Sequence, residues 1–300
     1  MQQMRYIVMF LAVFATAFSA FSQKEETLEV KLEAQISKTG YVGEALVYEL
    51  TLYSTSPNVA DIRVLRNPDI PSDVQVINGI VGNSKFKRIS EKGKFKYSKV
   101  IQRQYLIPKS SGKLNVKGGE YLLFIPYERL INRGFWNSRI VEYEELRCES
   151  NSVASKISSL PKSSTGFTGC VGSFSIQSWF PPGKITRGVE AFVVFKVSGY
   201  GSLANLKVPA LNKLFQKGCR LKEVEQSEEM MQRDGKLFSE VTLVCTFIPE
   251  EDDYEIEGLC IEFFNPETKK YYNACSDLLR GSGNSSNKKR NDSKNDAIAI

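Results

Sequence analysis

The residues with the greatest chemical potential in this sequence are six cysteines, at positions 148, 170, 219, 245, 260 and 275 of a 300-residue chain. The chain has no histidine. This excludes Ser-His-Asp and Cys-His catalysis as well as histidine metal sites. The cysteines form no Cys-x-x-Cys pair, so their spacing does not indicate zinc. We therefore predict a protein that is not an enzyme, with no catalytic residue, no metal ligand and no cofactor.

The cysteines allow disulfides if the chain is exported. Cys245 and Cys260 flank the acidic turn at residues 250–253 symmetrically, so a hairpin at this turn would place them opposite each other. Cys245–Cys260 is accordingly the pairing that the spacing suggests. Buried free thiols are the alternative, because cysteine is a good small core residue. The acidic turn lacks the spaced aspartate pattern of a calcium loop, which favours a solvated turn.

Aromatic and basic side chains gather in one segment, residues 130–140, which we expect to be a long loop interrupting a strand pair. Tryptophan and arginine are enriched among the residues that dominate protein interfaces. Arg133, Phe135, Trp136 and Arg139 are therefore the predicted partner-binding residues. The alternative is that Phe135 and Trp136 fold back onto the domain as a lid.

A second basic segment, residues 83–99, has seven lysines and arginines with three aromatic residues between them. Such a segment could bind an anionic polymer or lipid. The net charge of the whole chain is only +6, which argues against nucleic-acid binding. We favour a hairpin turning near Lys92, whose solvated lysines protect an exposed sheet edge from aggregation.

The two ends of the chain differ from the rest. Residues 1–22 have the zones of a secretory signal: Arg5, an apolar run at 6–15, then small residues with cleavage after Ser22. No later stretch reaches the length of a membrane span. The expected location is therefore the periplasm or cell envelope, with a soluble mature chain. Residues 280–300 are polar, and we expect a disordered tail there.

Between the ends, apolar and polar residues alternate with period two in short segments, which is typical of β-strands. The pattern also repeats. Residues 43–52 match 188–197 at an offset of 145, and residues 97–108 match 238–249 at an offset of 141. In both copies an Ile-Pro pair ends the strand, since proline has no backbone donor for the ladder.

Short strands at this spacing, in units of about 110 to 130 residues, are typical of antiparallel sandwiches. We predict an all-β chain with two tandem immunoglobulin-like β-sandwich domains. The first covers residues 23–155, a Ser/Pro/Lys linker covers 156–166, and the second domain covers 167–279. Gly169 and Gly172 at the start of the second unit are expected to bracket a turn, because an alternating strand follows them and a phosphate loop would need a helix.

Motifs in the second unit carry a family resemblance. They are Gly166-Phe-Thr-Gly-Cys-Val-Gly-Ser-Phe174, Val197-Ser-Gly-Tyr-Gly-Ser-Leu203, Val208-Pro-Ala-Leu211, Phe247-Ile-Pro249 and Phe263-Phe-Asn-Pro-Glu-Thr-Lys-Lys-Tyr-Tyr272. They resemble the BatD, or oxygen-tolerance, family of exported bacterial proteins, with Cys170 where that family commonly has a small residue. Together with the mixed-charge segment 126–148 of the first unit, the resemblance covers about residues 27–277.

The resemblance implies a non-catalytic envelope component of the Bat aerotolerance and stress system. Its implied partners are von Willebrand A-domain membrane proteins and a MoxR-type ATPase. Family members usually continue to a C-terminal membrane helix, and six cysteines are not a hallmark of the family. The alternative function is a surface carbohydrate-binding or adhesion module that uses Phe135, Trp136 and nearby tyrosines as stacking platforms.

Overall fold

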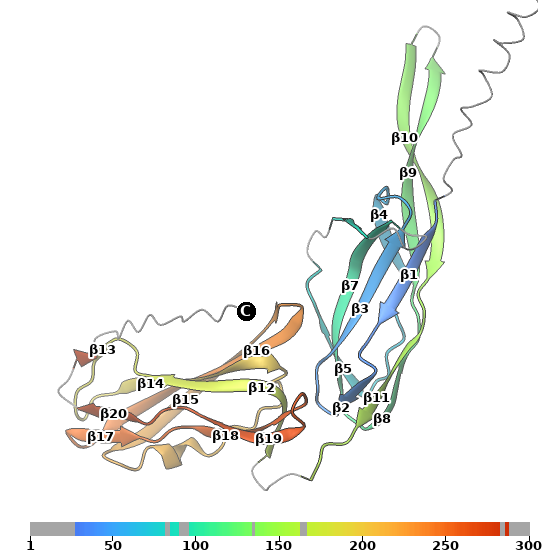
Figure 1. The fold of residues 1–300 in the computed structure, drawn as a ribbon. Helices are drawn as coiled ribbons and strands as arrows, with labels where there is room; N and C mark the ends of the chain where they lie inside the picture. The colour runs from blue at the N-terminus through green and yellow to red at the C-terminus, as the bar shows by residue number, and fades with distance from the viewer. Residues whose placement is uncertain are drawn as a thin grey trace, which may run out of the picture.

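The computed structural model describes residues 28–81, 85–89, 96–133, 136–162, 167–282 and 286–287. These residues form strands and turns, with one short 3-10 helix, η1 (Leu211–Leu214), and no α-helix among them (Figure 1). The predicted all-β class is confirmed. Within the described ranges, no helix has the length and apolar character needed to cross a membrane. The predicted signal segment, residues 1–22, lies outside the described residues.

The first unit contains strands β1 to β11 in three hydrogen-bonded sheets. The strands are β1 (Val30–Gln35), β2 (Thr39–Tyr41), β3 (Leu46–Ser54), β4 (Asp61–Arg66), β5 (Val74–Asn78), β6 (Lys87–Arg88), β7 (Tyr97–Pro108), β8 (Gly112–Val116), β9 (Glu120–Arg133), β10 (Trp136–Glu149) and β11 (Val153–Ser158). One sheet has the order β1-β3-β7-β5, with β6 also on β7; the others are β10-β9-β4 and β2-β11-β8. Alternate residues of these strands fill one core, which includes Tyr48, Leu50 and Leu123.

The second unit contains strands β12 to β21. They are β12 (Phe167–Trp179), β13 (Gly183–Lys184), β14 (Ala191–Gly201), β15 (Cys219–Arg233), β16 (Lys236–Pro249), β17 (Asp253–Ile256), β18 (Cys260–Asn265), β19 (Lys270–Cys275), β20 (Leu279–Ser282) and β21 (Ser286–Asn287). The main sheet has the order β15-β16-β14-β12-β18-β19, and the pairs β17–β20 and β13–β21 complete the unit. A separate core includes Phe195, Phe247 and Phe263. Both units have the layered packing of a sandwich, and their strand orders are compatible with an immunoglobulin-like arrangement.

The two units repeat each other in the register of their central strand pairs as far as Leu50, where the β3–β7 ladder shifts by one residue. Val47 lies opposite Tyr105 in the β3–β7 pair, and Phe192 lies opposite Thr246 in the β14–β16 pair. These are the positions that the offsets of 145 and 141 make equivalent. A glycine at positive φ precedes the first strand of each pair, and its N–H donates to the carbonyl of the final proline. The donor–acceptor distances are 2.9 Å for Gly43 to Pro108 and 2.8 Å for Gly188 to Pro249. The sequence repeat is therefore a structural repeat.

A buried serine fixes the same corner in both units. The Gly119 backbone N–H donates to Ser150 Oγ at 2.9 Å, and the Leu259 N–H donates to Ser276 Oγ at 3.0 Å. The backbone of each serine donates back, to the carbonyls of Gly119 and Leu259. These bonds join β9 to the end of β10, and β18 to the end of β19, where the chain bends from one strand pair into the next. No sequence motif indicated this pairing.

Two predicted boundaries need correction. The predicted linker 156–166 begins inside β11, because Lys156–Ser158 pair with β8 and β2; residues 163–166 lie outside the described part of the chain. The predicted tail 280–300 begins inside β20, which pairs with β17, and residues 286–287 form β21. Polar composition misled the prediction here, since short edge strands need few apolar residues. The remaining tail residues, 283–285 and 288–300, lie outside the described residues.

Strand β12 pairs with two different strands along its length. Its C-terminal half pairs with β14 in the antiparallel direction, and its N-terminal half pairs in parallel with β18 at Phe167 and Val171. In the first unit the corresponding edge of β9 is occupied by β4, which runs antiparallel. β12, the first strand of the second unit, therefore occupies the position beside β18 that β4 occupies beside β9 in the first unit.

Candidate partner-binding surface

The segment predicted to bind a partner lies on a long hairpin formed by β9 and β10. Their ladder runs without interruption from Glu120 opposite Glu149 to Arg133 opposite Trp136. The expected long loop at 130–140 is therefore wrong: only residues 134 and 135 connect the two strands. Beyond the end of β4, at Asp61 opposite Phe124, none of the other described strands accompanies this pair. The hairpin, which we call the arm (residues 125–144), projects away from the rest of the first unit (Figure 1).

The predicted binding residues lie at or near the tip of the arm. Arg133 and Trp136 are the last paired positions of the two strands. Phe135 lies outside the described residues, as do the side chains of Arg133 and Trp136, so the lid alternative stays open. Arg139 is exposed, and its Nη1 lies 3.4 Å from Oε2 of Glu128 on the facing strand. The structure thus brings Arg133, Trp136 and Arg139 to one end of one hairpin.

One face of the arm exposes apolar side chains. In an antiparallel pair, opposite residues point to the same face. Leu130 faces Arg139, Val141 faces Glu128, and Tyr143 faces Pro126, so all belong to one face. Leu130 is 68% exposed, Val141 57% and Tyr143 55%. A two-stranded hairpin cannot bury such residues by itself, since each of its faces needs another layer.

The opposite face holds a hydrogen-bonded cluster around Glu142. The Tyr127 hydroxyl donates to Glu142 Oε2 at 2.7 Å, and Arg129 Nη1 lies 3.3 Å from Oε1. The hydrogen bond from Tyr127 lowers the pKa of the Glu142 carboxyl, and the same bond raises the pKa of the Tyr127 hydroxyl. These groups lie at the surface, where such contacts add little stability. They lie on the face opposite Leu130, Val141 and Tyr143.

Leu130, Val141 and Tyr143 were missed by the sequence reasoning, which concentrated on tryptophan and arginine. A signal was present. Glu142, Glu144 and Glu145 interrupt the apolar alternation of residues 136–149, and a strand with charges on both faces cannot be buried on either. Two consecutive segments of this kind, joined by a short turn, predict a hairpin outside the core.

The described part of the basic segment 83–99 contains β6 and the start of β7, which pair with each other. Lys87 and Arg88 of β6 are exposed and pair with Ser98 and Tyr97. Phe86 packs against the core, and Lys99 Nζ lies 5.7 Å from the centre of its ring. Residues 90–95, which include Lys92, lie outside the described residues. Lys87 and Arg88 lie on the edge strand β6, in keeping with edge protection.

The glycine motifs of the second unit lie where β12 meets β14. A Cβ added at Gly199 would lie 2.0 Å from the Ser173 carbonyl oxygen, and one added at Gly172 would lie 2.3 Å from the Tyr200 oxygen. Both distances are far below contact. Gly169 has φ +92° and also lies within β12. The expected turn is therefore a strand irregularity: the glycines let β12 cross between its two partner strands while the backbones approach closely.

The same motifs border the contact between the two units. The Tyr41 and Phe264 rings pack edge to face, with centroids 5.0 Å apart, and the Tyr271 hydroxyl donates to the Pro161 carbonyl at 2.8 Å. Leu237, at the start of β16, packs with Tyr105 and Ile107 of the first unit. An apolar contact of this kind restricts the angle between the units.

A pocket of about 200 Å³ lies at this junction, lined by residues of both units. Glu44 from the first unit and Glu267 and Lys236 from the second contribute charge to it. Burial raises the pKa of the Glu44 carboxyl, an effect opposed by the hydrogen bond from the Tyr41 N–H and strengthened by the Glu267 charge. Lys236 Nζ lies 3.6 Å from Glu267 Oε1. These charged side chains do not form a set of groups that would select one class of ligand.

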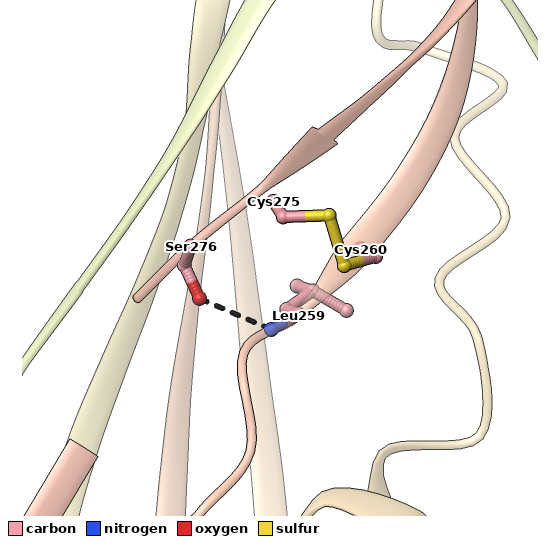
Figure 2. The surroundings of a disulfide bond; sticks show 4 residues. All are labelled: Leu259, Cys260, Cys275 and Ser276. Atoms are coloured by element: carbon pink, nitrogen blue, oxygen red, sulfur yellow. Dashed lines mark hydrogen bonds between the residues drawn. A yellow bond between two sulfur atoms is a disulfide. The ribbon is translucent and has the colours of Figure 1, made fainter. Parts of the chain in front are cut away.

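The disulfide of the second unit is not the predicted one. Cys260 of β18 bonds to Cys275 of β19, its direct partner in the ladder, with the Cα atoms 4.1 Å apart (Figure 2). The predicted Cys245–Cys260 pairing is wrong. Cys245 is buried in β16, which pairs with β14 and β15, so the acidic turn at 250–253 leads into a different strand pair and does not form a hairpin with β18.

The other four cysteines are free thiols. Cys170, Cys219 and Cys245 are buried in the core of the second unit, and burial raises the pKa to about 12 for Cys170 and Cys245 and to about 11 for Cys219. Burial also raises the pKa of the half-buried Cys148 thiol. A thiol that stays protonated is a poor nucleophile. These residues act as small core side chains, as the free-thiol alternative proposed.

Comparison with known proteins gives no assignment. No protein-family model matches the chain, and no curated protein sequence matches it. Over the described residues, no group of three or more cysteine, aspartate or glutamate side chains is arranged to hold a metal ion. Among the described residues, the exposed arm is therefore the strongest candidate for a functional surface.

Proposed function

We propose that this chain is a non-enzymatic, exported interaction protein of the BatD type, which binds a protein of the bacterial cell envelope through its arm. The proposed architecture is two tandem immunoglobulin-like domains that follow a cleaved signal peptide. The proposed partner is a von Willebrand A-domain protein of a Bat system. In this view the sandwiches support the arm and take no part in chemistry.

The single observation that carries the proposal is the exposed apolar face of the arm. Leu130, Val141 and Tyr143 lie on one side of a two-stranded hairpin that no other described strand covers. Contiguous exposed apolar residues with a polar rim are characteristic of protein contact sites. The ion pair Arg139–Glu128 supplies polar groups on the same face, directly across the hairpin from Leu130 and Val141.

Other features support the proposal. Three of the five motifs that resemble the BatD family, at residues 166–174, 197–203 and 263–272, contribute residues to the pocket between the two units. The Cys260–Cys275 disulfide is the kind of bond that persists in oxidising compartments, which is in keeping with export.

A capture experiment tests the proposal. The mature chain, immobilised, is incubated with solubilised envelope extract, and bound proteins are identified by mass spectrometry. We expect recovery of a von Willebrand A-domain protein. Leu130→Asp combined with Val141→Asp should abolish capture, because two charges on the apolar face cannot be desolvated. Phe135→Ala combined with Trp136→Ala tests the tip in the same way.

The matched control is Val189→Asp with Leu278→Asp, which changes two exposed aliphatic residues of the second unit. This variant should capture as well as the original chain. Circular dichroism and thermal melting of each variant show whether it is folded. Capture that survives the arm substitutions would reject the arm as the contact. Recovery of glycan without any A-domain protein would reject the BatD-type function.

A further inference from the structure

The second unit ends in a long open strand edge that the proposed function does not use. Strand β15 is the edge strand of the main sheet, and among the described strands it pairs with β16 alone. From Glu223 to Arg233, no described residue other than those of β16 forms a backbone hydrogen bond with it. One side of its backbone therefore presents a row of unpaired N–H and C=O groups.

This edge is backed by a complete sheet. β16 lies between β15 and β14, and β14 in turn pairs with β12. The arm, by contrast, is only two strands wide beyond residue 124. Strand addition needs an edge whose backbone is already held in the extended conformation, so that the incoming strand alone pays the ordering entropy. β15, with 15 residues, meets this requirement over a greater length than the edge strands β5 and β19, with 5 and 6.

Glutamates occupy both faces of β15. By register, Glu225 faces Val244 and Glu229 faces Glu240 on one face, while Glu228 faces Val241 on the other. These residues and Glu223 are exposed, and none forms an ion pair with a residue in the described ranges. Nearby cations have other partners: Lys196 is paired with Glu240 at 2.5 Å, and Lys222 is paired with Glu190. The sequence offers no lysine or arginine between Lys222 and Arg233.

Apolar side chains lie between these glutamates. Val224 is 38% exposed, Met230 36% and Met231 37%. A strand placed beside β15 would therefore meet carboxylates and apolar groups along the same edge. A single charge is enough to protect an edge from aggregation, and four like charges without counter-ions repel one another. A neighbouring strand that carries lysine or arginine would relieve this repulsion.

We propose that the β15 edge binds an extended basic segment of a partner protein by strand addition. The backbone ladder would supply affinity, and pairs between the partner's lysines or arginines and Glu223, Glu225, Glu228 and Glu229 would supply selectivity. The occupant is a strand that alternates basic with apolar or hydroxyl-bearing residues. The site is separate from the arm, so each can be lost without the other.

The test uses a labelled peptide of about twelve residues that alternates lysine with valine or threonine. Its binding to the full mature chain is followed by fluorescence anisotropy, and hydrogen exchange reports protection of the β15 amides. We expect saturable binding that protects β15. Glu225→Lys combined with Glu229→Lys should weaken binding about tenfold or more. Glu251→Lys combined with Glu257→Lys, outside β15 in the same unit, should change it less than about twofold.

Matched peptides separate strand addition from general charge attraction. A peptide of equal charge with prolines at alternate positions cannot pair along a ladder and should lose binding. Equal binding of this peptide, or no effect of the β15 substitutions, would overturn the proposal. So would binding that appears only when the chain is ended after Asn287, which would show that its own terminal segment occupies the edge. A dimer in sedimentation that the peptide dissociates would assign the edge to a second copy.

Discussion

The two units share a framework and differ in which hairpin is long. In the first unit β9 and β10 have 14 residues each, whereas their equivalents β18 and β19 have 6. In the second unit β15 has 15 residues, whereas its equivalent β5 has 5. The registers of the equivalent pairs β3–β7 and β14–β16 coincide from Leu46 to Leu50, after which β3–β7 shifts by one residue. The longer strands carry the exposed face of the arm and the open edge of β15. Both proposed binding surfaces therefore lie where the two units differ.

The units also differ in how the chain enters them. β1 begins the first unit as an ordinary antiparallel partner of β3. β12 begins the second unit in parallel with β18 and only then turns to pair with β14. The glycines that allow this crossing have no counterpart in the first unit, where Ser54 stands at the position equivalent to Gly199. At its entering strand, the second unit therefore depends on closely packed glycines where the first unit does not.

The largest expected effect tests this difference. Gly199→Ala should lower the free energy of unfolding of the second unit by about 4 kcal/mol or more, because its Cβ would lie 2.0 Å from the Ser173 oxygen. Gly183→Ala is the control, since no atom lies within 4 Å of its added Cβ, and should cost less than about 0.5 kcal/mol. Urea unfolding measures both. Similar free energies of unfolding for the two variants would show that the close backbone approach at Gly199 does not distinguish the first strand of the second unit from that of the first.

The disulfide is the next largest difference, because only the second unit has one among the described residues. Cys260→Ser with Cys275→Ser should cost about 2–3 kcal/mol, the loop-closure value for a separation of 15 residues. The loss should be confined to the second unit, as judged by hydrogen exchange of its amides. Thiol titration of the original chain under denaturing, non-reducing conditions should find four free thiols; six would contradict the bond.

The shared serine corner predicts equal effects. Ser150→Ala and Ser276→Ala each leave a buried backbone N–H without its acceptor, which costs about 1–2 kcal/mol. Each variant should destabilise its own unit by a similar amount in urea unfolding. An effect in one unit only would show that the two corners are not equivalent. Ser175→Ala, at an exposed position, serves as the control.

The smallest effect concerns pH at the junction. Because the folded chain raises the pKa of Glu44, its carboxyl keeps its proton to a higher pH when folded than when unfolded. Stability from this group is therefore present at low pH and is lost as pH rises through its folded pKa. Glu44→Gln, which keeps an acceptor for the Tyr41 N–H, should be slightly more stable than the original chain near pH 7 and no more stable near pH 4. Thermal melts at the two pH values measure this; a gain at pH 4 alone would contradict the sign.

Much of the framework was predictable from local patterns. Alternation identified β3, β7, β14 and β16, and the repeated Ile-Pro pairs fixed where the long strands end. The glycines at 43 and 188 marked equivalent turns. The arm was located as a segment rich in aromatic residues and arginine but was taken for a loop, because glutamates on both faces of a strand resemble a solvated loop in sequence.

Only the tertiary structure shows which strands pair with each other. Cys245 and Cys260 are as far apart in sequence as Cys260 and Cys275, and only the assignment of β16 and β18 to different strand pairs decides between them. The same is true of β12, whose sequence gives no sign of two different partner strands. Residue types and spacing determined that this chain is built of strands, is duplicated and has no histidine chemistry. Strand pairing joins residues that are distant in sequence, so only the folded chain decided which edges and faces are left open.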